Sequence, residues 1–206
     1  MYEPNVIYHL YNHTINTELA FRTPENYLFF LRKMRKYLLP VGDILCYCLM
    51  PTHFHMLFRP NELGCAPSAS KRPHRFGEDL GRPAYQQRTS HALRIMLSGY
   101  TKALNKQEGR RGALFRGNTK KKTERLGIAD VSLHIPTDRP FVLGIPYLIY
   151  CFHYIHLNPV KAGLVDVATA WPYSSAADFA GLRNGTLPNF ELVEELLSIT
   201  RSPNLY

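Results

Sequence analysis

The chain has few cysteines and no paired cysteine motif, which limits the kinds of site it can build. Cys46, Cys48, Cys65 and Cys151 form no Cys-x-x-Cys pair, so neither a zinc knuckle nor a disulfide framework is indicated. No apolar run approaches the ~18–20 residues of a membrane span. The first ten residues lack the basic and apolar regions of a secretory signal. These absences predict a cytoplasmic protein with reduced, mostly buried thiols and no membrane partner.

Acidic residues are scarce in the middle third. Between Asn61 and Arg125 there are 15 Lys and Arg against 5 Asp and Glu, whereas the rest of the chain has 10 against 11. The whole excess behind the net charge of +9 therefore lies in this segment. Such an asymmetry is typical of a surface that binds a polyanion, most often nucleic acid. A solvated basic loop would show the same charge, so charge alone leaves both interpretations open.

What the chain does have is the composition of a folded domain. Its 206 residues are 45% hydrophobic and 12% aromatic, which is enough to bury a core and too apolar for a disordered segment. The sequence contains no internal repeat, low-complexity tract or clear boundary. We therefore expect a single domain over residues 1–206.

Residue spacing predicts a short series of strands and helices. The strands are expected over 6–11, 44–50 and 53–59, and the helices over 24–38, 90–107, 146–158 and about 189–200. Residues 61–88 are expected to form a loop, and residues 109–145 to be irregular. The order β-α-β-β-α-…-α indicates an α+β fold in which helices cover an antiparallel sheet.

His53 and His55 are the sharpest candidate site. On a strand, side chains two residues apart share a face, so both imidazoles project together while Phe54 points to the other layer. Two imidazoles on a rigid strand supply two ligands of a divalent metal site. Because an isolated His-x-His occurs often by chance, the pair alone does not distinguish a metal site from two ordinary histidines.

A second group of polar side chains lies on one face of the third predicted helix, which we expect to end at Asn158-Pro159. Tyr147, Tyr150, Tyr154 and Asn158 are 3, 4 and 4 residues apart, a spacing that places them together. Three phenols and a carboxamide are poor core material, because each polar group needs a partner when it is buried. They either line a site or anchor the helix to neighbouring loops.

Five blocks of the sequence resemble REP-associated tyrosine transposases, a branch of the single-tyrosine HUH transposases. The two longest are YCLMPTHFH at 47–55 and YIHLNPVKAGLV at 154–165. The others are YHLYN at 8–12, GALFR at 112–116 and WPYSS at 171–175. All five occur in family order over about residues 5–178.

The resemblance implies a ferredoxin-like antiparallel sheet with an HUH-endonuclease core. It implies that His53 and His55 bind a divalent metal, Mg²⁺ or Mn²⁺, that Asn158 completes the metal shell, and that Tyr154 is the nucleophile. The implied activity is cleavage and rejoining of single-stranded DNA near hairpin repeats through a 5′-phosphotyrosine intermediate. No small-molecule cofactor is implied. The family context favours a bacterial protein, associated with the nucleoid when it is bound to DNA, and a monomer over a homodimer.

The basic segment between Asn61 and Arg125 is expected to bind DNA. The residues predicted to contact it are Lys71, Arg72, Arg75, Arg110, Arg111, Arg116, Lys120, Lys121 and Lys122. Tyr85, Tyr100 and Phe115 are candidate stacking platforms for unpaired bases. Residues 118–145 interrupt the family pattern, either as a DNA-contacting insertion or as a surface excursion, and residues 117–120 match the family's basic strand poorly.

Two other functions fit part of this pattern. A catalytically silent regulator derived from a transposase would bind hairpin or single-stranded DNA through the basic region, but it would not need Tyr154 and both histidines together. A replication or conjugation relaxase would share the chemistry, although relaxases are usually larger and often carry three-histidine metal sites.

Overall fold

The computed structural model describes residues 1–69, 85–123 and 145–206. Its strands are β1 (Tyr8–His13), β2 (Gly42–Met50), β3 (His53–Pro60) and β4 (Lys120–Thr123). Its helices are α1 (Pro24–Leu38), α2 (Glu62–Cys65), α3 (Arg88–Gln107), α4 (Ile145–Lys161), α5 (Ala176–Phe179) and α6 (Phe190–Leu197).

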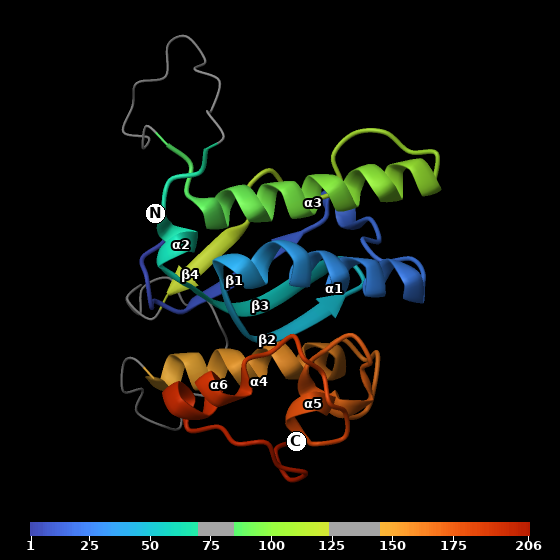
Figure 1. Cartoon of the computed structure of the whole chain (residues 1–206). Coiled ribbons are helices and arrows are strands. Elements are labelled where there is room, and N and C mark those ends of the chain that lie inside the picture. Colours follow the sequence, from blue (N-terminus) through green and yellow to red (C-terminus); the bar gives the residue numbers. More distant parts are fainter. Residues whose placement is uncertain (70–84, 124–144) are drawn as a thin grey trace.

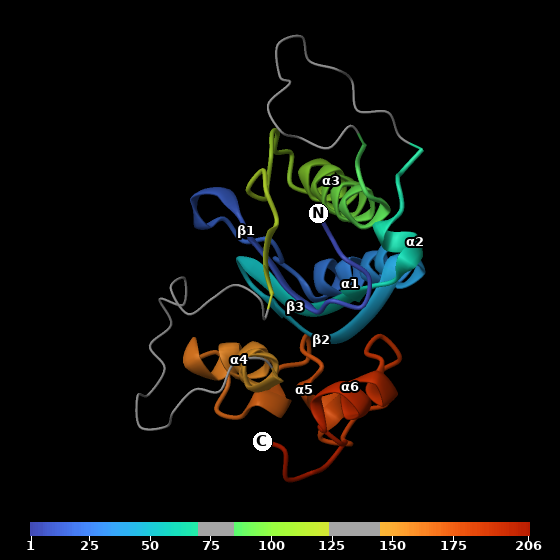
Figure 2. The ribbon, with the colours of Figure 1, turned by 90° about the vertical axis from the view of Figure 1, so that its left-hand side faces the viewer.

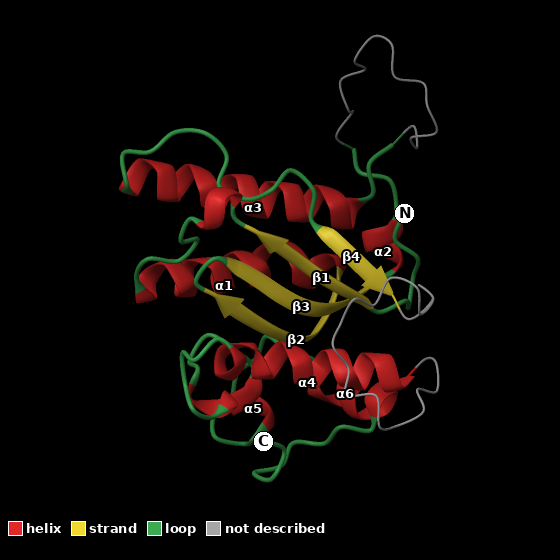
Figure 3. Ribbon diagram, turned by 180° about the vertical axis from the view of Figure 1, so that it is seen from behind, coloured by secondary structure: helices red, strands yellow, loops and turns green. Residues whose placement is uncertain are grey.

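The four strands form one sheet in the order β2-β3-β1-β4, with antiparallel pairing throughout (Figure 3). Because α1 connects β1 to β2 and α3 lies between β3 and β4, the chain runs β-α-β-β-α-β, which is the ferredoxin-like order. The structure thus confirms the α+β fold class and the ferredoxin-like sheet predicted from the sequence.

Helices cover both faces of the sheet (Figures 1 and 2). α1 and α3 pack on one face, where Phe30 and Met96 meet strand residues such as Phe54. α4 and α6 pack on the other face, where Phe152 meets strand residues such as Leu57. This division follows from the alternation of strand side chains between the two faces. In the part of the chain that the structure describes, no helix is both long and apolar enough to cross a membrane.

The WPYSS block fixes the α4–α6 layer to the sheet. The Trp171 indole N–H donates to the Leu49 carbonyl at 2.9 Å, and the Ser175 backbone N–H donates to the Tyr47 carbonyl at 3.0 Å. The Ser175 hydroxyl also lies 2.7 Å from Nε2 of the fully buried His156 on α4. A chain of buried hydrogen bonds therefore joins α4 to strand β2.

The predicted end of the third helix at Asn158-Pro159 is wrong. α4 continues to Lys161 with Pro159 inside it, and the Ala162 N–H still donates to the Asn158 carbonyl at 3.0 Å. Proline removes the hydrogen bond that its own N–H would donate and crowds the preceding turn, whereas the following turn keeps its hydrogen bonds. Gly163, with φ of +66°, is in the left-handed conformation that commonly follows a helix.

Two segments predicted to lack regular structure contain some. Residues 120–123, placed in the irregular stretch, form β4 along the free edge of β1. Residues 62–65, placed in the predicted loop, form α2, because the Asn61 side chain caps the Gly64 N–H at 2.8 Å. In both cases local propensity is weak and tertiary hydrogen bonds decide the outcome.

Candidate active site

The candidate site lies on the sheet face that α4 covers. His53 and His55 of β3 point to this face, as the two-residue spacing predicts. The register of the β1·β3 pair places His13 opposite His53 and Tyr11 opposite His55. Directly opposed residues of an antiparallel pair share a face, so β1 adds its own alternate side chains, His9, Tyr11 and His13, to the site.

Four histidines of β1 and β3 contact one another, namely His9, His13, His53 and His55. His9 Nε2 lies 2.9 Å from His55 Nδ1, and the rings of His13 and His53 stack with centroids 4.5 Å apart. The His53 and His55 rings are nearly perpendicular, with centroids 5.0 Å apart. His9 and His55 are 6% and 5% exposed, whereas His13 and His53 are partly exposed, so the cluster is buried at the His9–His55 contact and reached by solvent at His13 and His53.

Both histidines of the pair have their Nδ1 atoms engaged. His55 Nδ1 bonds His9, and His53 Nδ1 lies 3.0 Å from the Thr52 hydroxyl. Neither Nε2 has a hydrogen bond within the described residues. Such an outer hydrogen bond fixes the tautomer and ring orientation of a metal-ligating histidine. The imidazoles are therefore arranged to offer Nε2.

Burial keeps the imidazoles neutral. It lowers the pKa of His53 to about 4, with His13 acting in the same direction, and it holds the pKa of His55 well below its usual range. A metal ligand must be the neutral imidazole. The donor set fits two ligands of a divalent cation. The described residues contain no group of three or more His, Cys, Asp or Glu side chains arranged to hold a metal.

Tyr154 lies against His55 and His9. Its ring centroid is 5.8 Å from that of His55 and 6.2 Å from that of His9, edge-on to both. Tyr150, one turn earlier on α4, stacks on Tyr154 with centroids 6.1 Å apart. Tyr147 is buried at 8% exposure and belongs to the packing of α4. The structure thus brings His53, His55 and Tyr154 together within one chain.

The predicted third metal ligand, Asn158, sits one turn beyond Tyr154. Its Nδ2 donates to the Tyr154 backbone carbonyl at 2.8 Å, which leaves Oδ1 as its acceptor atom. No hydrogen bond joins Asn158 to either imidazole within the described residues. Its role as a metal ligand stays a prediction.

Burial raises the pKa of the Tyr154 phenol above its ordinary value, and the Asn158 side chain opposes this shift. The phenol therefore carries its proton at neutral pH. A cation lies beside it, since Lys161 Nζ is 5.0 Å from the centre of the Tyr154 ring. Sequence analysis did not single out Lys161, although its place seven residues after Tyr154 puts it on the same helix face.

The three lysines of β4 do not all face the site. Lys122 pairs with His9 and Lys120 with Tyr11, so both belong to the site face. Lys121 points to the other face, where its ammonium lies 4.5 Å from the Tyr2 ring centre and bonds the Met1 carbonyl. Strand alternation therefore assigns two of the three predicted contacts to the edge of the site.

The remaining predicted DNA contacts are spread out. Arg111 and Arg116 are exposed, whereas Arg110 forms an ion pair with Glu18 at 2.9 Å and bonds Asn105. Arg110 is thus engaged in holding its own loop. Lys71, Arg72 and Arg75 lie outside the described residues, as do positions 124–144 of the predicted 118–145 insertion.

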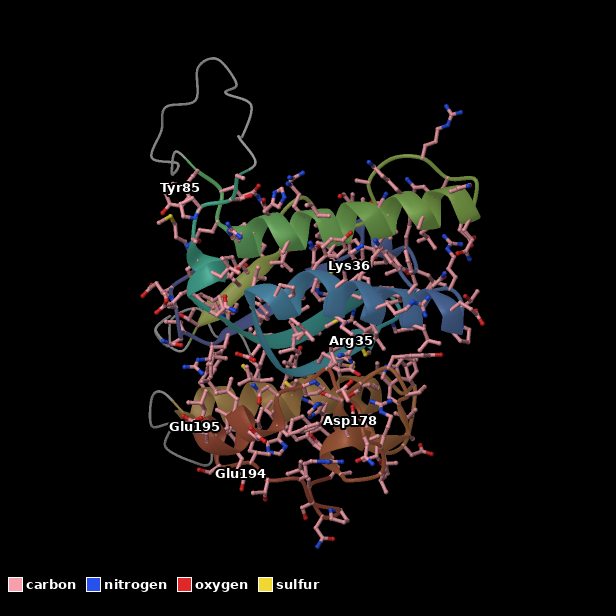
Figure 4. All side chains as sticks on the ribbon, in the orientation of Figure 1. Arg35, Lys36, Tyr85, Asp178, Glu194 and Glu195 are labelled. Carbon is pink, nitrogen blue, oxygen red and sulfur yellow. The ribbon has the colours of Figure 1, made fainter. Side chains whose placement is uncertain are left out.

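Two of the three predicted stacking platforms are wrong. Tyr100 and Phe115 are 1% and 6% exposed and pack in the core between the sheet, α1 and α3. The Tyr100 hydroxyl is also bonded to the Ala20 carbonyl. Neither ring has a free face for a base. Tyr85 is 37% exposed and stays a prediction (Figure 4).

Sequence reasoning missed His9, Tyr11 and His13, although their alternation on a predicted strand repeats the signal used for His53 and His55. What the sequence could not supply is the β1·β3 register, which brings His9 to a residue 46 positions away.

Comparison with known proteins identifies the fold. A solved structure of a REP-associated tyrosine transposase bound to a REP hairpin matches with a TM-score of 0.56 and 15% sequence identity, over 92% of this chain and 92% of that chain. No protein-family model matches the sequence, and no curated protein matches it. At this level of identity the similarity establishes a shared fold over nearly the whole length.

Proposed function

We propose that this protein is a transposase-like endonuclease that cuts and rejoins single-stranded DNA near hairpin repeats, with Tyr154 as its nucleophile. The observation that carries the proposal is the contact between Tyr154 on α4 and His55 of the paired histidines on β3, with ring centroids 5.8 Å apart. The five sequence blocks and the shared fold with a transposase bound to a REP hairpin support it.

His53 and His55 would hold a divalent cation, Mg²⁺ or Mn²⁺, through their Nε2 atoms, and Asn158 Oδ1 is the proposed additional protein ligand. When bound, such a cation polarises a non-bridging oxygen of the scissile phosphate as a Lewis acid. Imidazole ligands suit Mn²⁺ well, whereas Mg²⁺ prefers oxygen and would rely on phosphate and water for the rest of its shell.

Tyr154 carries the covalent step. Its Oη attacks the phosphorus and forms a new P–O bond, while the bond from phosphorus to the 3′ oxygen of the preceding nucleotide breaks. The 3′ oxygen takes up a proton and leaves as a 3′-hydroxyl, and the 5′-phosphate stays on the tyrosine. The reverse attack by a 3′-hydroxyl releases Tyr154 and reseals a strand, so no external energy source is needed.

The phenol must lose its proton as it attacks, and its raised pKa makes this costly in the free protein. Asn158, whose side chain lowers the pKa of the phenol, reduces that cost. Lys161 is the proposed cation that stabilises the developing negative charge, because its ammonium lies 5.0 Å from the ring centre. Lys120 and Lys122 would neutralise backbone phosphates at the sheet edge beside the site.

A covalent-adduct assay tests the proposal. Single-stranded oligonucleotides carrying hairpin repeats from around the gene are incubated with the protein and Mn²⁺ or Mg²⁺, and the mixture is denatured and resolved by gel electrophoresis. We expect DNA attached to the protein, and no adduct with Tyr154→Phe or His53→Ala. Tyr150→Phe is the matched control, because Tyr150 is the neighbouring phenol on the same helix face.

An adduct that persists in Tyr154→Phe would contradict the assignment of the nucleophile. The absence of any adduct with every metal, together with tight, salt-sensitive hairpin binding, would contradict the enzyme. It would instead favour the catalytically silent regulator.

A further inference from the structure

A groove on the far face of the sheet has no role in the proposed chemistry. It runs between α3 and residues 112–119, has a volume of about 650 Å³, and is lined from β1 by Asn12. Its α3 wall extends from Ser90 to Asn105, a rise of about 22 Å at 1.5 Å per residue. A groove of this length accommodates several nucleotides of one strand.

The groove contains a fixed and unsatisfied acceptor. The Asn12 side chain is 1% exposed, and its Nδ2 donates to the Arg116 carbonyl and to the Thr119 hydroxyl, each at 3.1 Å. Its Oδ1 has no hydrogen-bond partner among the described residues. A buried acceptor left without a partner costs about 1–3 kcal/mol. Both residues that hold the amide also line the groove.

The charged residues that the structure shows lining the groove are all basic. Arg94, Lys102 and Arg116 line it and are exposed, and no acidic residue is among its described lining. Exposed acidic side chains lie outside this lining, for example Glu108 directly after α3, and Glu194 and Glu195 on α6 in the layer across the sheet (Figure 4). Three cations around a lining of mixed polar and apolar side chains suit a strand whose phosphates face outward and whose bases face inward.

The groove adjoins the site through a single strand. Asn12 points to the α3 face, while its neighbours Tyr11 and His13 point to the site face of β1. A DNA strand that leaves the site past the β4 edge, where Lys120 lies opposite Tyr11, would reach the groove by turning around that edge.

We propose that the groove between α3 and residues 112–119 binds unpaired nucleotides of the substrate strand, with Asn12 Oδ1 accepting a hydrogen bond from the exocyclic amino group of a base. Arg94, Lys102 and Arg116 contact the backbone phosphates. The DNA assignment rests on the proposed function, whereas the groove itself rests on its charge and on Asn12. Adenine, cytosine and guanine carry such an amino donor, whereas thymine has none and presents a carbonyl at the position where cytosine carries its N4 amino group.

Fluorescence anisotropy with full-length protein in EDTA tests the groove without any catalysis. The probes are oligo(dC) and oligo(dT) of equal length at neutral pH, which differ at the N4 donor. We expect oligo(dC) to bind at least fivefold tighter. Three phosphate contacts predict a log Kobs against log salt slope of about −2, from about −0.7 per contact on single strands.

Two charge reversals separate the groove from general electrostatics. Arg94→Glu and Lys102→Glu alter exposed side chains, and each should weaken binding by at least tenfold and make the salt slope shallower. Lys36→Glu is the matched control: Lys36 is an exposed lysine on α1 (Figure 4), and no α1 residue is among the described lining of the groove. It carries the same charge change and should alter binding less than twofold.

Asn12→Leu, which has the same side-chain branching and number of heavy atoms, should abolish the preference for oligo(dC) over oligo(dT). Because this buried change risks the fold, circular dichroism accompanies it, and the two charge reversals decide the groove if it unfolds. Parent-like binding by Arg94→Glu and Lys102→Glu, or an equal loss in Lys36→Glu, would overturn the proposal. A preference for oligo(dC) that persists in folded Asn12→Leu would also overturn it, and so would tighter binding of oligo(rC) than of oligo(dC).

The proposed groove and the proposed nuclease activity can be refuted independently of each other. Groove-dependent binding without any Tyr154 adduct would contradict the nuclease and support the groove. Adduct formation with unchanged DNA binding in the groove variants would contradict the groove alone.

Discussion

Replacing His9 with alanine removes the hydrogen-bond partner of His55 without touching either proposed histidine ligand. His9 Nε2 lies 2.9 Å from His55 Nδ1. For His55 to offer its Nε2 lone pair to a cation, its proton must sit on Nδ1 and point to His9. Without that acceptor the His55 ring loses both its preferred tautomer and its fixed orientation.

The size of the effect follows from this geometry. Loss of an outer partner of a metal-ligating histidine typically weakens metal binding 10- to 100-fold, which corresponds to about 1.4–2.7 kcal/mol. His9→Ala should therefore bind Mn²⁺ 10- to 100-fold more weakly than the parent. His9→Gln places an amide near the same atom and should recover most of the affinity.

The assay is a titration of the DNA-free protein with Mn²⁺, in which the electron paramagnetic resonance signal of free Mn²⁺ measures its binding. His13→Ala is the matched control. His13 lies on the same strand and face, and it contacts His53 by ring stacking, with no hydrogen bond to either imidazole in the described part of the chain. It should weaken binding less than His9→Ala does.

Parent-like affinity in His9→Ala, combined with lost binding in His53→Ala, would refute the tautomer argument while keeping the site. Unchanged binding in His53→Ala would refute the site itself.

Three further predictions concern α4 and its support. Lys161→Ala should slow single-turnover adduct formation about three- to tenfold, because the cation beside Tyr154 is lost. Lys161→Arg keeps the charge and should react near the parent rate. An unchanged rate in Lys161→Ala would exclude a role for Lys161 in adduct formation. His156→Ala should lower the free energy of unfolding in urea by about 2–4 kcal/mol, because it leaves a cavity at a fully buried position and removes the hydrogen-bond partner of the Tyr206 hydroxyl; a loss under about 1 kcal/mol would contradict it. Arg183→Ala removes the cation that lies 2.7 Å from the fully buried carboxylate of Asp178. Since the Arg183 side chain is 36% exposed, we expect the free energy of unfolding in urea to fall by about 2–3 kcal/mol. A loss as large in Arg183→Lys would show that geometry, not charge, matters.

The sequence by itself determined the features that depend on neighbours along the chain. The two-residue period of a strand places His53 and His55 on one face, and the spacing of α4 places Tyr154 and Asn158 one turn apart. Helix α1 has the predicted bounds, and the Asn189 side chain caps α6 by accepting the Leu192 N–H at 3.1 Å, because caps are local hydrogen bonds.

Only the tertiary structure decided which distant residues meet. The register of β1 on β3 brings His9 to His55, and the free edge of β1 turns residues 120–123 into a strand whose alternate lysines face opposite layers. Tyr100 and Phe115 are buried for the same reason: the packing of α3 on the sheet encloses them. Aromatic composition gives no signal of which face a helix will bury, because burial depends on contacts between residues far apart in the chain.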